Sequence, residues 1–166
     1  MAVIVMADDG IAFDGDSLAG GPLGGAETAF ISLAEALAGR GHGVTIYNKC
    51  AQPMTRNGVA WEPIEHGLPQ AADLYIANRG DRLLPLVPSA RSRVFWIHNP
   101  AGYLKKWRYL SKLWRRRPAV VFSSQFHANS FPAWAPSGAR VTIPYGISVA
   151  FLDTEPARDP PPPRAV

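Results

Sequence analysis

Six short apolar runs, rich in β-branched residues, constrain the fold of this chain more than any other feature. Each run is continuous rather than alternating with polar residues, which is typical of strands that are covered on both faces. Such strands belong to parallel sheets, so the pattern predicts one here. The runs are residues 3–6, 44–47, 74–77, 94–97, 120–122 and 141–143.

Helical patterns separate several of these runs. Apolar residues between Phe30 and Leu37 recur at helical spacing, and Gly39 and Gly41 end that pattern. Residues 103–114 have the same periodicity, and a further helix is expected to end before Pro132. Strands that alternate with helices in this way predict an α/β fold with a Rossmann-like, doubly wound and mostly parallel sheet.

A glycine-rich segment, "GGPLGGAE" at residues 20–27, precedes the first of these helices. Glycine loses much conformational freedom on folding, so its use here suggests a close approach of the backbone to a ligand. Free amides and the positive end of the helix dipole favour an anion at a helix start. We therefore predict that Gly24 and Gly25 bind a diphosphate; a flexible loop is the alternative interpretation.

Other nucleotide-binding and metal-binding patterns are missing from the sequence. It contains neither G-x-G-x-x-G nor G-K-S/T, and Tyr47, Asn48 and Lys49 stand where an NAD-binding strand would end in Asp or Glu. These absences argue against a nicotinamide-dependent oxidoreductase and a P-loop enzyme. No spacing suggests a metal site, so we expect no metal and no required cofactor.

Composition predicts one globular domain over residues 1–153 and a different segment after it. Residues 154–166 hold five prolines and are expected to form a linker toward a missing C-terminal domain. Cys50 is the single cysteine, and the N-terminus has no basic region or cleavage site of a signal peptide. A cytoplasmic location is therefore expected, with attachment to the membrane surface as a further expectation.

Three segments resemble retaining GT-B glycosyltransferases, particularly family 4. Residues 24–47, "GGAETAFISLAEALAGRGHGVTIY", resemble the first glycine loop, helix and second strand of that family. "VVFSSQFHANSF" and "VTIPYGIS" resemble segments near the end of its N-terminal domain, although Tyr145 and Ser148 stand where Asn and Asp are usual. The resemblance spans about residues 1–152 and implies the N-terminal, acceptor-side half of a two-domain enzyme.

The resemblance also implies a reaction and roles for particular residues. The whole enzyme would be a hexosyltransferase that moves a sugar from a nucleoside diphosphate sugar to a carbohydrate or lipid-linked acceptor, as in cell-envelope polysaccharide synthesis. Gly24 and Gly25 would contact the donor diphosphate, and His98, at the end of a strand, would face the transferred sugar. A structural histidine bonded to a nearby carbonyl is the alternative for His98.

Acidic residues near the glycine segment are candidates for binding acceptor hydroxyls. Asp14 and Asp16 lie in the long loop between residues 10 and 21, and Glu27 lies in the first helical turn. Simple solvation is the alternative for the two aspartates. Arg79 and Asp81 follow another strand; a surface ion pair is expected for them, and a position facing the cleft is the alternative.

A basic helical segment holds 7 of the 17 Lys and Arg residues of the chain, between Lys105 and Arg117. Apolar residues at helical spacing line one of its faces, and most of the charges lie outside that face. The segment predicts either a membrane or acceptor surface or a helix whose tryptophans face the sheet. The residues assigned to that surface are Lys105, Lys106, Trp107, Arg108, Lys112, Arg115 and Arg116.

Two function classes follow. The first is the half-enzyme, which alone is expected to be catalytically incomplete and whose partners are the nucleotide sugar, the acceptor and a second domain of the same chain. The second is a non-catalytic Rossmann-like module that binds an anion or a membrane. No nucleic-acid-binding module is recognisable, so no nucleic acid partner is expected.

Overall fold

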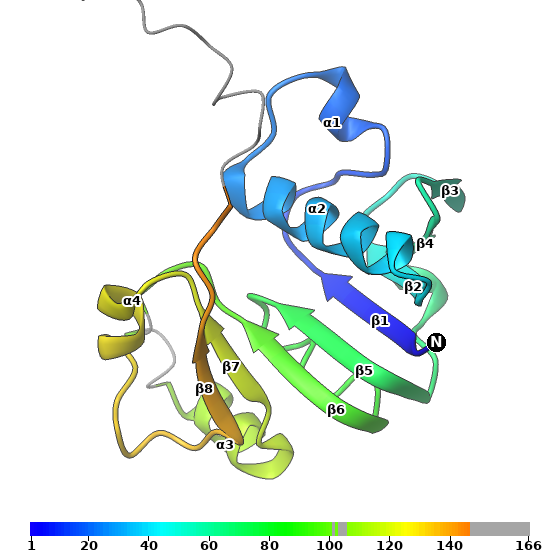
Figure 1. Cartoon of the computed structure of the whole chain (residues 1–166). Coiled ribbons are helices and arrows are strands. Elements are labelled where there is room, and N and C mark those ends of the chain that lie inside the picture. The colour runs from blue at the N-terminus through cyan, green and yellow to red at the C-terminus, as the bar shows by residue number, and fades with distance from the viewer. Residues whose placement is uncertain (101, 103–105, 147–166) are drawn as a thin grey trace, which may run out of the picture.

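The computed structural model describes residues 1–100, 102 and 106–146, and within these ranges the chain forms a mostly parallel eight-stranded sheet flanked by helices. This arrangement is consistent with a Rossmann-like fold (Figure 1). The expected linker, residues 154–166, and Lys105 lie outside the described residues. The strands, in chain order, are β1 (Val3–Asp8), β2 (Gly43–Asn48), β3 (Met54–Arg56), β4 (Val59–Pro63), β5 (Ala71–Asn78), β6 (Ser89–Trp96), β7 (Ala119–Phe122) and β8 (Ala139–Thr142).

The strand order is β3-β4-β2-β1-β5-β6-β7-β8. All six predicted strands are present, and every neighbouring pair except β3–β4 is parallel. From β1 the chain continues outward in one direction through β2 and in the other through β5. The carboxyl ends of β1 and β5 therefore form a topological switch point, where ligands bind in sheets of this type.

The sequence prediction missed the hairpin of β3 and β4. Asn57 and Gly58 form its two-residue turn with φ of 48° and 77°. Two central residues with positive φ are the mark of a type I′ turn, for which Asn-Gly is the favoured pair. The Asn57-Gly58 dipeptide was therefore the sequence feature from which this hairpin could have been predicted.

Helices cover the two faces of the sheet unequally. The long helix α2 (Gly25–Gly39) covers one face, and its Phe30, Ile31 and Ala34 are fully buried against β1, β2 and β4. The other helices are α1 (Ser17–Gly20), α3 (Trp107–Arg116) and α4 (Gln125–Asn129), with a 3-10 turn at Ile64–His66. Tyr109 and Leu113 of α3 belong to the hydrophobic cluster on the opposite face of the sheet from α2.

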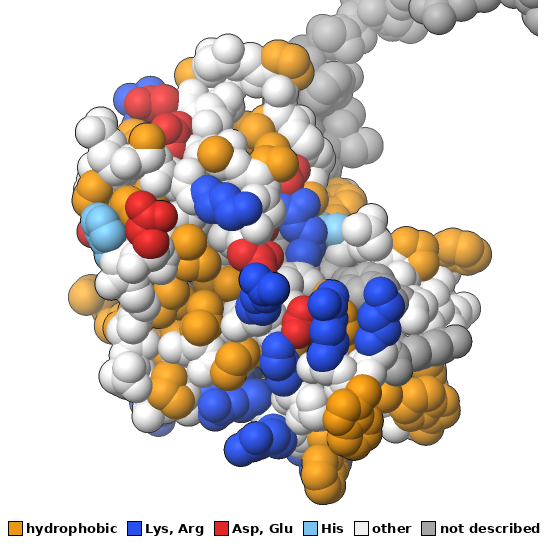
Figure 2. All heavy atoms as spheres, turned by 180° about the vertical axis from the view of Figure 1, so that it is seen from behind, with side chains coloured by type: hydrophobic (Ala, Val, Ile, Leu, Met, Phe, Trp, Pro, Cys, Tyr) orange, Lys and Arg blue, Asp and Glu red, His pale blue; other side chains and the backbone are white. Residues whose placement is uncertain are grey.

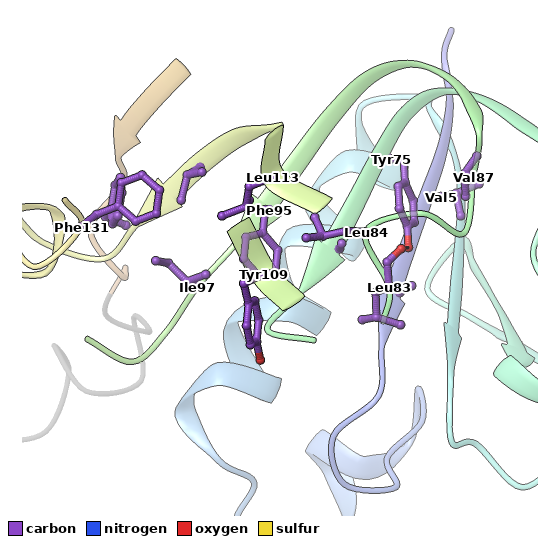
Figure 3. Close-up of a cluster of buried hydrophobic side chains, with 14 of the residues drawn as sticks. Val5, Tyr75, Leu83, Leu84, Val87, Phe95, Ile97, Tyr109, Leu113 and Phe131 are labelled. Atoms are coloured by element: carbon purple, nitrogen blue, oxygen red, sulfur yellow. Dashed lines mark hydrogen bonds between the residues drawn. The ribbon is translucent and has the colours of Figure 1, made fainter. Parts of the chain in front are cut away.

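Turns rather than a helix join β5 and β6. Residues 79–88 contribute Leu83, Leu84 and Val87 to the hydrophobic cluster on the same face of the sheet as α3. Figure 3 shows Leu84 close to Phe95 and Leu113, with Leu83 beside Tyr75 and Val87 beside Val5. Loop residues thus supply the apolar cover that a crossover helix would otherwise give.

The long loop after β1 is anchored to the core. Phe13 is buried and makes edge-on ring contacts with Phe30, at 6.3 Å, and with Trp61, at 5.9 Å. Asn48 at the end of β2 donates to the Phe13 carbonyl over 2.6 Å. These contacts fix the loop that leads to the glycine segment.

Candidate functional site

Three polar side chains stand in a row across the carboxyl ends of β1, β5 and β6. Asp8 pairs in register with Asn78, and Asn78 with Trp96, two residues before His98. Alternate residues of a strand share a face of the sheet. Met6, Ile76 and Trp96 belong to the cluster on the α2 side. Asp8, Asn78 and His98, each two residues further on, therefore lie on that side as well. The sheet register therefore brings together three residues that lie far apart in the sequence.

A directed chain of hydrogen bonds joins this row. The Asp8 carboxylate can only accept, so the Asn78 Nδ2 that lies 2.5 Å from Asp8 Oδ2 must be the donor. The remaining amide oxygen, Oδ1, then accepts from His98 Nε2 over 2.5 Å. His98 Nδ1 is left as the acceptor for the Tyr145 hydroxyl. Through Asn78, the buried Asp8 carboxylate thus fixes the tautomer of His98, with the proton on Nε2.

His98 is held in its neutral form. Burial, followed by the positive charge of Arg79, lowers the pKa of His98 from 6.5 to about 4. Its ring packs at 5.0 Å from Trp96 and stacks parallel to Tyr145 at 5.9 Å. At neutral pH the imidazole can donate and accept hydrogen bonds, but it does not carry a positive charge.

Arg79 links the row to the start of α2. Its Nη2 lies 2.8 Å from Asp8 Oδ2 and 2.8 Å from Glu27 Oε1. Asp8 is 0% exposed and Arg79 is 26% exposed along its side chain. The expectation of a surface ion pair at Arg79 was therefore wrong, because strand β5 ends beside a buried carboxylate.

Arg79 also has a left-handed backbone, with φ of 63°. A residue with a Cβ atom reaches this region only at an energetic cost, and such residues cluster at functional sites. The strained turn is stabilised by the bond from the Arg79 amide to the Trp96 carbonyl and by the two ion pairs.

Asp81, for which a surface ion pair was also expected, is buried, and its carboxylate lies 2.6 Å from Lys112 Nζ of α3.

The two predicted glycines differ in their surroundings. A Cβ atom on Gly24 would lie 2.2 Å from Glu27 Oε2, so this glycine makes room for a carboxylate of the same chain. A Cβ atom on Gly25 would meet nothing within 4 Å. The first amides of α2 have no acceptor within the helix, so the open side of Gly25 is where an anion can approach.

Glu27 lies at the beginning of α2 but is buried rather than open to solvent. Burial alone would raise the pKa of its carboxyl, yet the bonds from its own amide and from Arg79 lower it. Its carboxylate is thus ionised and held by Arg79. Its predicted role in binding an acceptor stays a prediction.

Asp14 and Asp16 act within their loop. Asp14 Oδ1 accepts from the Asp16 amide at 3.0 Å and from the Ser17 hydroxyl at 2.9 Å. Asp16 forms an exposed ion pair with Arg56 over 3.3 Å. The structure does not bring either carboxylate into the row of Asp8, Asn78 and His98, and their predicted contact with an acceptor stays a prediction.

The row could be predicted only in part from the sequence. His98 was singled out because it follows a strand, whereas Asp8 and Asn78 were missed although they also end strands. A polar residue at the end of each buried run was the available signal. Within the described residues, no group of three or more His, Cys, Asp or Glu side chains is arranged to hold a metal ion.

Comparisons of the chain with protein-family models, curated sequences and solved structures found no match.

Proposed function

We propose that this chain is the acceptor-side half of a GT-B glycosyltransferase that uses a nucleoside diphosphate sugar. The proposal depends on one juxtaposition: the open, glycine-started end of α2 beside the row of Asp8, Asn78 and His98 at the switch point. In α/β sheets this edge is where nucleotides and their phosphates bind. The sequence resemblance gives the reaction class.

The row offers the sugar a neutral hydrogen-bond acceptor, His98 Nδ1, rather than a nucleophile, because Nε2 already donates to Asn78. Sugar transfer of this kind needs a positioned donor and stabilisation of the charge on the departing diphosphate. In the proposed reaction the Gly25 amide binds that diphosphate, and the Arg79 guanidinium lies at the same helix start. When the Tyr145 hydroxyl moves away from His98 Nδ1, that nitrogen can accept a hydrogen bond from a sugar hydroxyl.

A matched pair of glycine variants tests the diphosphate contact. Gly25→Val fills the open side of the helix start, whereas Gly39→Val adds the same side chain at the other end of α2, where the space is also open. We expect Gly25→Val to weaken binding of UDP, GDP or ADP sugars at least about tenfold, or about 1.4 kcal/mol, in calorimetry. Gly39→Val should bind like the parent chain.

Both variants should keep the parent melting temperature to within a few degrees, since an added Cβ atom at either position meets nothing within 4 Å. Equal affinity of the two variants would contradict the proposed site. Transfer of sugar by residues 1–166 alone would contradict the assignment to a half-enzyme.

A further inference from the structure

Helix α3 carries two apolar stripes, of which the sheet uses only one. Tyr109 and Leu113 are buried against the sheet. Trp107 and Trp114, on the other side of the helix, are 77% and 69% exposed. The expectation that the tryptophans face the sheet was therefore wrong, because the smaller stripe of Tyr109 and Leu113 fills that place.

A second segment extends this exposed stripe. Trp134, from the connection between α4 and β8, is 66% exposed and lies with Pro136 along the same groove as Trp107, Leu110 and Trp114. The groove has a volume of about 500 Å³. Large apolar groups are normally scattered singly on a protein surface, so three tryptophans around one groove indicate an interaction site.

Several cationic side chains belong to the helix that forms one wall of this groove. Arg117 lines it, and Lys106, Arg108, Arg115 and Arg116 come from the same short stretch. Figure 2 shows Lys and Arg side chains gathered beside large hydrophobic groups on this side of the molecule. Asp81 pairs with Arg108 and Lys112, but no carboxylate among the described residues lies within ion-pair distance of Arg115, Arg116 or Arg117.

The chemistry of this surface fits a lipid headgroup region. Indole rings prefer the boundary between water and hydrocarbon, and arginines beside them can bind lipid phosphates. A carbohydrate site would need several convergent polar groups, whereas the described residues that line the groove offer only Ser111 and Arg117 beside indoles and apolar side chains. An amphipathic helix with unpaired cations and exposed tryptophans instead matches a monotopic membrane contact. No helix of the described chain is long and apolar enough to cross a bilayer.

We propose that α3 and the segment 132–136 form a docking surface for an anionic membrane, in which Trp107, Trp114 and Trp134 enter the headgroup region and Arg115–Arg117 bind lipid phosphates. This surface lies on the opposite face of the sheet from α2. It therefore stands independently of the proposed nucleotide site. Trp134 and Pro136, which come from outside the basic helix, are the new members of this surface.

Sedimentation with vesicles tests the proposal. Vesicles of phosphatidylcholine with about 30% phosphatidylglycerol, in low salt, should bind the chain, and vesicles of pure phosphatidylcholine should bind it at least about tenfold more weakly. Binding should fall again in 0.5 M salt, because the Debye length shrinks to a few ångströms, about 3 Å at 1 M. Brominated lipids should quench tryptophan fluorescence in the bound state.

Variants separate this surface from general stickiness. The triple variant Trp107→Ala, Trp114→Ala, Trp134→Ala should lose at least about tenfold in vesicle affinity. The control is Phe126→Ala, which removes an exposed aromatic ring that does not line the groove. It should bind as the parent chain does. The single variant Trp114→Ala, with a smaller expected loss, serves if the triple variant unfolds.

Three results would overturn the proposal. One is a lack of binding to the anionic vesicles in low salt. Another is equal binding by the tryptophan variants and Phe126→Ala. The third is a concentration-dependent dimer in sedimentation equilibrium that the triple variant abolishes while vesicle binding persists, since the groove would then join two copies of the chain.

Discussion

Replacement of Asp8 by alanine is expected to lower the free energy of unfolding by about 3–5 kcal/mol, the cost of removing one partner of a buried ion pair. The Asp8 carboxylate is fully buried and accepts from Asn78, from Arg79 and from the Gly10 amide. Without it, a guanidinium and an amide lose their acceptor inside the protein. Urea unfolding followed by circular dichroism measures the change.

Two further variants give this prediction its controls. Asp8→Asn keeps the size of the side chain but removes its charge, so it should destabilise the protein less than Asp8→Ala. Asp73→Ala removes a carboxylate that bonds the Val3 amide and Arg91 at the protein surface, and its effect should be much smaller. A loss of stability in Asp8→Ala no larger than that in Asp73→Ala would contradict the described ion-pair network.

The second large effect is a dependence of stability on pH that comes from His98. The folded pKa of about 4 lies below the unfolded value of 6.5, so between these pH values the unfolded chain binds a proton that the folded chain does not. The free energy of unfolding should therefore fall as the pH is lowered from about 6.5 to about 4. The shift corresponds to at most about 3 kcal/mol, and this contribution is constant above and below that window.

The variant His98→Gln isolates this contribution. Its side-chain amide can still donate to Asn78 but does not titrate, so the difference in unfolding free energy between parent and variant should change across this pH window. Carboxylates that titrate in the same range cancel in this difference. A difference that stays flat from pH 4 to 6.5, or an imidazole that titrates near 6.5 in NMR spectra of the folded protein, would contradict the partly buried, neutral state of His98.

The sequence predicts the sheet well because its signals are local. Continuous apolar runs marked all six predicted strands, and the helix of residues 25–39 followed from the spacing of Phe30, Leu33 and Leu37. The hairpin of β3 and β4 was missed although Asn57-Gly58 marks its turn, because each of its strands is short and only partly apolar. The orientation of α3 was not predictable, because both of its stripes have helical spacing and only packing selects one.

The candidate site depended on information that a single sequence lacks. His98 could be placed at the edge of the sheet, but its partners are set by the order of β1, β5 and β6 and by their register. Arg79 looked like a surface residue because nothing near it in the sequence shows that Asp8 and Glu27 meet there. Gly24 and Gly25 looked equivalent, and only the folded position of Glu27 distinguishes them.

The most direct test of the nucleotide site is an NMR titration of the ¹⁵N-labelled chain with UDP-, GDP- and ADP-sugars. The account predicts that at least one of them shifts the amide signals of Gly25 and Ala26 and of Arg79, together with the ring signals of His98. Shifts confined to other parts of the chain, or none at millimolar ligand, would contradict a nucleoside diphosphate site at this edge of the sheet.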